Sequence, residues 1–175
     1  RILEAMQWIY SNRKKYNIRV LNLSFGAVPE SRNDPLVLGA EALWDAGVAV
    51  VASAGNLGPK GGTILSPAVS PKIITVGGAE GLGAADFSSR GPAGLFHKPD
   101  LLAPAVDVIP AADPYAPQSG TSMAAPQVSA AAALVFESHP DYTPDAVKAT
   151  LLKACRPLDC DADTCGAGLI DFSTL

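Results

Sequence analysis

The stretch that decides the fold of this chain is residues 118–126, which read QSGTSMAAP. A glycine-containing turn leads into Ser122, and an alanine-rich run with the composition of a helix follows it. The first N–H groups of a helix have no partner inside the helix, so they point outward and favour negative charge. A serine hydroxyl at this place is therefore predicted to act as a nucleophile, although serine and threonine also begin helices as simple N-caps.

Strand and helix patterns alternate on both sides of this stretch. Strands are predicted where β-branched and aliphatic residues gather, and helices where apolar residues recur at helical spacing. This alternation indicates an α/β fold with a parallel sheet and right-handed crossovers. The predicted strands are 18–25, 47–54 and 72–77, with a short extended piece at 100–103, and the predicted helices are 2–16, 34–46, 123–138 and 143–154.

Two of these stretches have an unusual composition. The run 123–138 is apolar nearly all round, which predicts a central buried helix, and Pro126 is tolerated there because it falls in or near the first turn. Residues 86–118 carry spaced prolines that confine the chain to turns and short extended pieces. These prolines are Pro92, Pro99, Pro104, Pro110, Pro114 and Pro117.

The composition indicates one soluble, globular domain over residues 1–175. The chain is 48% hydrophobic with a net charge of -4, which is enough apolar material for a substantial core. Asp, Gly or Pro interrupts every apolar run, so no membrane-spanning helix is predicted, and the acidic balance argues against nucleic acid as a partner. Cys155, Cys160 and Cys165 allow one disulfide and a free thiol, or a third partner elsewhere.

The first residues of the chain have the pattern of the interior of a helix. Helical apolar spacing begins at Ile2, directly after Arg1, and no capping residue precedes it. We therefore expect the chain to be a piece of a longer precursor, in which case a missing signal peptide says nothing about location.

Residues 120–126 (GTSMAAP) resemble the active-serine signature of the subtilisin-like serine proteases, also called subtilases or peptidase family S8. The resemblance extends over nearly the whole chain, in the order of the family. It implies the C-terminal half of a catalytic domain with a three-layer α/β fold, in which helices cover both faces of a mostly parallel sheet. The other matching stretches are 23–26 (LSFG), 53–56 (SAGN), 86–92, 98–104 and 166–171.

The resemblance implies a role for each residue around the nucleophile. Ser122 is expected to attack a peptide bond and form an acyl-enzyme. Asn56 is expected to donate from its side chain to the oxyanion, together with the backbone N–H of Ser122, and Thr121 to add a weaker hydroxyl contact.

Two further segments are expected to bind the substrate. Ser24, Phe25 and Gly26 resemble the strand end that pairs with the substrate backbone as an added strand. Ala52, Ser53, Ala54 and Gly55 resemble one wall of the pocket for the residue before the scissile bond. These walls are small, which suggests room for a large apolar side chain above a floor within residues 57–66.

The general base is the part of the machinery that the sequence lacks. The aspartate and histidine motifs of the family precede the point at which this chain begins. Its two histidines, His97 and His139, are predicted to lie at the surface, and His139 follows Ser122 by roughly 24 Å of helical rise. We therefore expect this chain to be nearly or wholly inactive alone.

The resemblance also bears on partners, cofactors and location. The strand at 18–23 is expected to be a bare edge, which binds the missing N-terminal half as a separate chain or associates with a second copy. Peptides or proteins are the expected substrates. No cofactor is expected to be required, although the turn 66–70 resembles a place where relatives hold a weak calcium or sodium ion. The family implies a secreted or extracytoplasmic location.

Two other functions are open at this point. Residues 120–124 differ at one position from the G-x-S-x-G elbow of α/β-hydrolase esterases, but a proline-rich stretch precedes Ser122 where that fold has a strand. A non-catalytic module could use the same cleft to bind peptides.

Overall fold

The elements of the fold follow the predicted alternation. The computed structural model describes residues 1–29, 34–111 and 115–175. Its helices are α1 (Ile2–Asn12), α2 (Pro35–Asp45), α3 (Thr121–Ser138), α4 (Pro144–Lys153) and α5 (Ala162–Cys165), with a 3-10 turn at Phe172–Thr174. Its strands are β1 (Val20–Leu23), β2 (Ala49–Ser53), β3 (Ile74–Glu80), β4 (Gly83–Ala84), β5 (Leu101–Pro104), β6 (Cys155–Arg156) and β7 (Leu169–Ile170).

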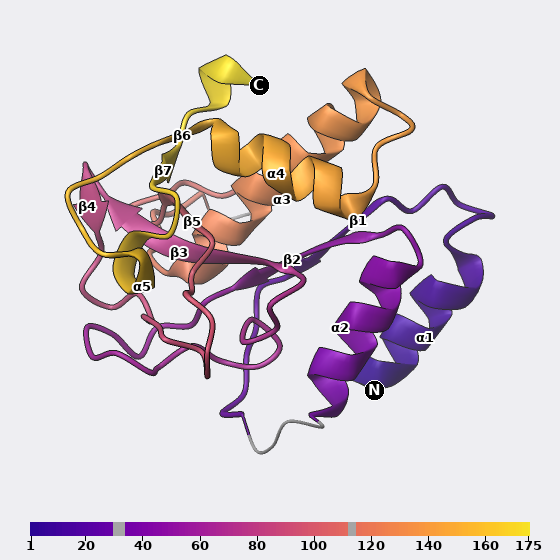
Figure 1. Ribbon diagram of the computed structural model, residues 1–175, viewed down its shortest axis with the longest axis horizontal. Coiled ribbons are helices and arrows are strands. Elements are labelled where there is room, and N and C mark those ends of the chain that lie inside the picture. The colour runs from indigo at the N-terminus through magenta and orange to yellow at the C-terminus, as the bar shows by residue number, and fades with distance from the viewer. Residues whose placement is uncertain (30–33, 112–114) are drawn as a thin grey trace.

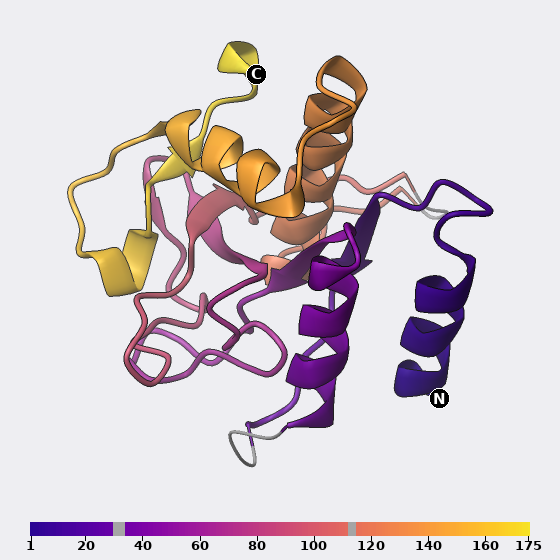
Figure 2. The same cartoon turned by 45° about the vertical axis from the view of Figure 1, so that its right-hand side comes forward.

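One mostly parallel sheet runs through the molecule in the order β1-β2-β3-β5-β7-β6. The pairs from β1 to β7 are parallel, β6 runs antiparallel to β7, and β4 pairs with β3 off this path. Helix α3 packs on one face, against β1, β2, β3 and β5, whereas α2 packs against β2 with α1 outside it (Figures 1 and 2). The predicted α/β class, with helices on both faces of the sheet, is confirmed.

Local signals explain where the helices begin. Asp34 accepts a hydrogen bond from the N–H of Leu36, and Pro35 occupies the first turn of α2. Thr143 caps α4 in the same way, through the N–H of Ala146. Every residue of β2 is buried, as its continuous apolar run predicted.

Some predicted boundaries are wrong. Helix α1 ends at Asn12 instead of residue 16, and the chain then turns through Asn17, whose φ of 51° is one that asparagine tolerates. Strand β1 is shorter than 18–25, and β3 continues to Glu80. No long helix occurs in the described parts of 86–118, as predicted, while residues 112–114, with Pro114, lie outside the described residues.

Helix α3 is less buried than its composition predicted. Its sheet-facing side is packed, with Ala124, Val128 and Ala132 fully buried. The other side is open, and Leu134 is 56% exposed. A hollow between this side and the edge strand β1 is lined by Val20, Leu134 and Phe136 among others. The prediction of a helix buried all round is therefore wrong, because none of the described residues covers that side.

The cysteines form one disulfide and leave one thiol. Cys160 and Cys165 are bonded, and Cys155 is half-buried and free. Burial raises the pKa of Cys155 to about 11, so its thiol stays protonated and unreactive at neutral pH. Among the described residues, no helix combines the length and the apolar character that are needed to cross a lipid bilayer.

Candidate active site

Ser122 lies in the first turn of α3 and is tied to the end of β1. Its Oγ donates to the carbonyl oxygen of Ser24 (3.1 Å), and Ser24 Oγ donates to the carbonyl oxygen of Ser122 (3.1 Å). The two serines therefore hold each other, although 98 residues separate them in the chain. The end of β1 at Ser24 therefore lies beside Ser122.

Pro126 explains why Ser24 makes this contact. A residue four positions after Ser122 would normally donate its backbone N–H to the carbonyl of Ser122, but proline has no N–H. Pro126 is the sixth residue of α3, so the prediction that it falls in or near the first turn is wrong. The hydroxyl of Ser24 takes the place of the missing N–H, which keeps this carbonyl satisfied.

Asn56 faces the start of the same helix. Its Oδ1 accepts from the backbone N–H of Thr121 (3.0 Å) and from Thr121 Oγ1 (2.9 Å). Because a backbone N–H can only donate, the oxygen end of the amide is fixed toward Thr121, and Nδ2 is the end left to bind something else. A Cβ added at Gly120 would lie 3.3 Å from Nδ2, so the NH2 group lies against the residue that precedes Thr121.

Thr121 braces this arrangement. Its hydroxyl donates to Asn56 Oδ1 and accepts from the N–H of Gly55 (3.2 Å), and the side chain is buried. Thr121 was predicted to contact the oxyanion weakly, whereas here its hydroxyl orients the amide of Asn56. The carboxyl ends of β1 and β2 and the amino end of α3 therefore meet at one place.

The structure positions the other predicted site residues around this place. Ser24 and Phe25 are half-buried and Gly26 is exposed at the end of β1. Ala52, Ser53, Ala54 and Gly55 are buried at the end of β2. These two segments are bridged by residues 65 and 66, since Leu65 N–H donates to the carbonyl of Ala54 and Ser66 pairs with Ala27.

Sequence reasoning missed a polar chain behind Ser24. Ser129 Oγ donates to Asn22 Oδ1 (2.9 Å), and Asn22 Nδ2 donates to Ser24 Oγ (2.8 Å). Gln127 similarly ties α3 to the end of β5, because its Nε2 donates to the carbonyl of Pro104 (2.8 Å). A polar asparagine inside an apolar strand is the signal that could have pointed to the first contact.

The two histidines lie away from Ser122. His97 Nδ1 is 3.0 Å from Asp163 Oδ1 and the ring is largely exposed. His139 caps the far end of α3 and stacks on Tyr142, with ring centroids 4.3 Å apart. In the part of the chain that the structure describes, the hydrogen of Ser122 goes to a backbone carbonyl and no side-chain base accepts it.

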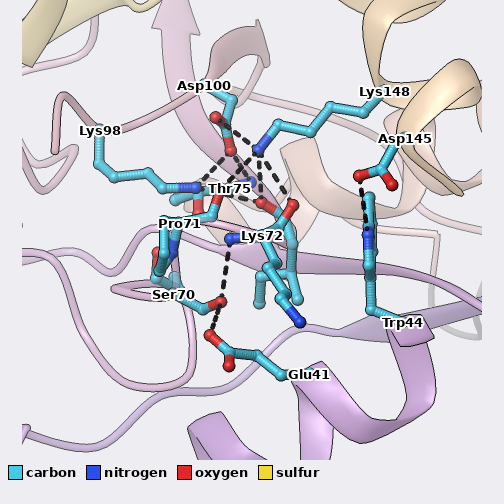
Figure 3. A network of polar contacts seen from close by, with 12 residues as sticks. Glu41, Trp44, Ser70, Pro71, Lys72, Thr75, Lys98, Asp100, Asp145 and Lys148 are labelled. Atoms are coloured by element: carbon cyan, nitrogen blue, oxygen red, sulfur yellow. Dashed lines mark hydrogen bonds and ion pairs between the residues drawn. The ribbon is translucent and has the colours of Figure 1, made fainter. Parts of the chain in front are cut away.

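A charged network lies at the opposite ends of the strands, where β3 and β5 begin (Figure 3). Asp100 is 2.6 Å from Lys98 Nζ and 2.9 Å from Lys148 Nζ, and it also accepts from the N–H of Thr75. Lys98 is 1% exposed, and burial lowers its pKa to about 8 although the carboxylate of Asp100 opposes this decrease. The ammonium form therefore prevails at neutral pH.

Two lysines bind backbone carbonyls that follow the turn 66–70. The carbonyl of Ile73 accepts from Lys98 (3.1 Å) and Lys148 (2.9 Å), and Lys148 also donates to the carbonyls of Pro71 and Lys72. The carbonyl of Ala68, in the turn 66–70, accepts from Thr75 Oγ1. The carbonyls of residues 71–73 therefore already face positive charge. Among the described residues, no group of three His, Cys, Asp or Glu side chains is placed to hold a metal.

Replacing Asp100 by asparagine is expected to lower the free energy of unfolding by about 3 kcal/mol, because Lys98 is left buried without its counter-charge. The ammonium of Lys98 needs this charge only below its pKa of about 8, so the loss should be larger at about pH 6 than at about pH 9. Denaturant titration at the two pH values measures it. EDTA should leave the unfolding midpoint unchanged.

Asp45→Asn is the matched control, since it breaks the exposed pair between Asp45 and Lys72. This variant is expected to have the same denaturant midpoint of unfolding as the parent chain. Equal midpoints for the two variants would contradict the structural role given to Asp100. A midpoint that falls on chelation would contradict the expectation that no metal ion is required.

Comparison with known proteins assigns the chain to a family. The model of the Subtilase family, Peptidase_S8, matches residues 1–168. The serine protease AprX of Bacillus subtilis (strain 168) is 36% identical over 203 residues, which cover 97% of this chain and 46% of AprX. Subtilisin amylosacchariticus of Bacillus subtilis subsp. amylosacchariticus is 34% identical over 148 residues, or 81% of this chain and 36% of that protein.

Solved structures agree with these relatives. The S41 psychrophilic protease superposes with a TM-score of 0.84 at 28% identity, over 97% of this chain and 62% of that one. This chain spans less than half the length of the two curated relatives named above. Since the family model covers nearly every residue and the fold agrees, the chain belongs to the subtilase family.

Proposed function

We propose that this chain is the C-terminal half of the catalytic domain of a subtilisin-like serine endopeptidase, as one partial domain over residues 1–175. The observation that carries the proposal is the convergence of Ser122 and Asn56 at the start of α3. A nucleophilic hydroxyl, an amide held with its N–H end free and the N–H groups of a helix start are the parts that acyl transfer requires.

The proposed reaction uses these parts in two steps. Ser122 Oγ attacks the carbonyl carbon of the scissile bond and gives up its proton to a base, while Asn56 Nδ2 and the backbone N–H of Ser122 bind the oxyanion. The C–N bond then breaks, the base returns the proton to the leaving amine, and water hydrolyses the acyl-enzyme. Neither His97 nor His139 is placed to be that base, so we propose that it comes from the part of the protein that corresponds to the N-terminal half.

A fluorophosphonate probe tests the proposal in the protein that contains this chain. Such a probe reacts with an activated serine, so covalent labelling at Ser122, located by peptide mass analysis, is the expected result. Absence of labelling under conditions in which the protein is folded would favour the alternative, a non-catalytic peptide-binding subtilase-like module. The esterase alternative loses its basis, because membership of the subtilase family excludes the α/β-hydrolase fold.

We also propose that no metal ion or other cofactor is required, and that the protein is secreted or extracytoplasmic. The carbonyl of Ala68 in the turn 66–70 already accepts from Thr75 Oγ1, which supports the first point. The disulfide between Cys160 and Cys165 supports the second, since disulfides persist in oxidising compartments. Fractionation of cells that make the protein tests the location.

The edge of the sheet suggests a partner. Among the described strands, β1 pairs only with β2, and the hollow beside it is lined by apolar residues of α3. We propose that this edge binds the N-terminal half of the domain, or a second copy of the chain when that half is absent. Sedimentation should therefore show a dimer of the isolated chain, or a complex after the N-terminal half is added. A strict monomer at high concentration in both samples would count against it.

A further inference from the structure

Leu65 lies between the two segments that are expected to bind the substrate. Its backbone N–H donates to the carbonyl of Ala54 at the end of β2 (3.0 Å). The next residue, Ser66, exchanges two hydrogen bonds with Ala27, just after the end of β1 (3.0 and 2.8 Å). The carbonyl of Leu65 also accepts from the N–H of Val69 (3.1 Å). These contacts clamp the backbone of Leu65 across the ends of both strands.

The side chain of Leu65 fills the space between two glycines. A Cβ added at Gly26 would lie 2.7 Å from Leu65 Cβ and 3.0 Å from its Cδ1. A Cβ added at Gly55 would lie 2.8 Å from Leu65 Cγ and 2.8 Å from Cδ1. Carbon atoms in contact are normally about 3.5 to 4.0 Å apart, so neither glycine position has room for a Cβ beside the leucine. The gap between the segments is therefore one leucine side chain wide.

We infer that Leu65 forms the floor of the substrate pocket and limits the residue before the scissile bond to a small side chain such as alanine, glycine or serine. This inference rests on the proposed peptidase function. The sequence suggested that the small wall within residues 52–55 leaves room for a large apolar side chain, but Leu65 takes this room. The pocket thus accepts what fits above the leucine, and a phenyl ring would have to displace it.

Displacement of Leu65 is unfavourable for two reasons. Hydrogen bonds on both sides of the residue hold its backbone, and Pro67 restricts the residue before it, Ser66. The partly exposed side chain lies between Gly26 and Gly55. A substrate with a large side chain therefore loses the contacts that its extra carbons would otherwise make.

Matched peptides that differ only in the residue before the scissile bond test the inference in the protein that contains this chain. The parent protein should cleave the alanine peptide with a kcat/KM roughly 10 to 200 times that of the phenylalanine peptide. Leu65→Ala should raise kcat/KM for the phenylalanine peptide by about tenfold or more and leave the alanine peptide within a few-fold. Leu82→Ala, in an exposed turn between β3 and β4, is the control and should change neither.

Each outcome separates this inference from the function on which it rests. Labelling of Ser122 together with a preference for phenylalanine that Leu65→Ala leaves unchanged overturns the role of Leu65 and keeps the peptidase. Absence of both labelling and cleavage overturns the peptidase, and the role of Leu65 falls with it. If circular dichroism shows that Leu65→Ala is unfolded, Leu65→Val replaces it, and a gain for the phenylalanine peptide smaller than that stated for Leu65→Ala is the supporting result.

Discussion

Peptide cleavage is expected to fall by about a million-fold in kcat when Ser122 is replaced by alanine, because no other hydroxyl can form the acyl-enzyme. That magnitude is the one known for the nucleophile of a subtilisin and is adopted here for a relative. KM should change little, since the oxyanion donors and the strand end at Ser24 stay in place. Steady-state kinetics of the complete protein measures the loss.

Ser119→Ala is the control for this variant. Ser119 is exposed three residues before Ser122, and its hydroxyl accepts only from the backbone N–H of Asp107 among the contacts of the described residues. Its activity should stay within a few-fold of the parent. Should Ser122→Ala retain more than about a thousandth of the parental kcat, another group must be the nucleophile and the proposed mechanism is wrong.

Replacing Asn56 by leucine is expected to lower kcat by roughly 100-fold to 1,000-fold, because the oxyanion then loses its side-chain donor. The range again comes from a subtilisin. Leucine has a similar volume but cannot accept hydrogen bonds from Thr121. Part of the decrease in kcat therefore comes from the loss of these two hydrogen bonds at the start of α3. Measuring kcat and KM separately decides the role, since a donor that acts mainly in the transition state lowers kcat.

Asn12→Leu provides the comparison for Asn56. Asn12 ends α1 and donates to a backbone carbonyl of its own helix, so this variant should cleave peptides at the parental rate. An Asn56→Leu variant that raises KM and keeps kcat would show that Asn56 binds the ground state as strongly as the transition state. That result would remove it from the oxyanion hole.

The two ends of the parallel strands carry different groups. Ser24, Asn56 and the start of α3 lie where β1 and β2 end. The network of Asp100 with two lysines lies where β3 and β5 begin. Because the length of the sheet separates them, substitution of Asp100 should alter stability, whereas substitution of Asn56 should alter turnover.

The sequence by itself determined the order and type of most elements. A strand buried on both faces needs a continuous apolar run, and a helix start needs a cap such as Asp34 or Thr143, so both leave a signal within a few neighbouring residues. The motif around Ser122 and the SAGN segment at Asn56 were likewise readable, because the chemistry demands fixed residue types at fixed spacing.

Only the tertiary structure decided which distant residues complete these signals. The hydroxyl of Ser24 replaces the N–H that Pro126 lacks, and Leu65 fills the gap between Gly26 and Gly55. Whether α3 is covered all round likewise depends on what packs against Leu134. Local sequence patterns act through backbone preferences over a few residues, whereas these contacts join residues tens of positions apart. They exist only after the parallel strands have brought their ends together.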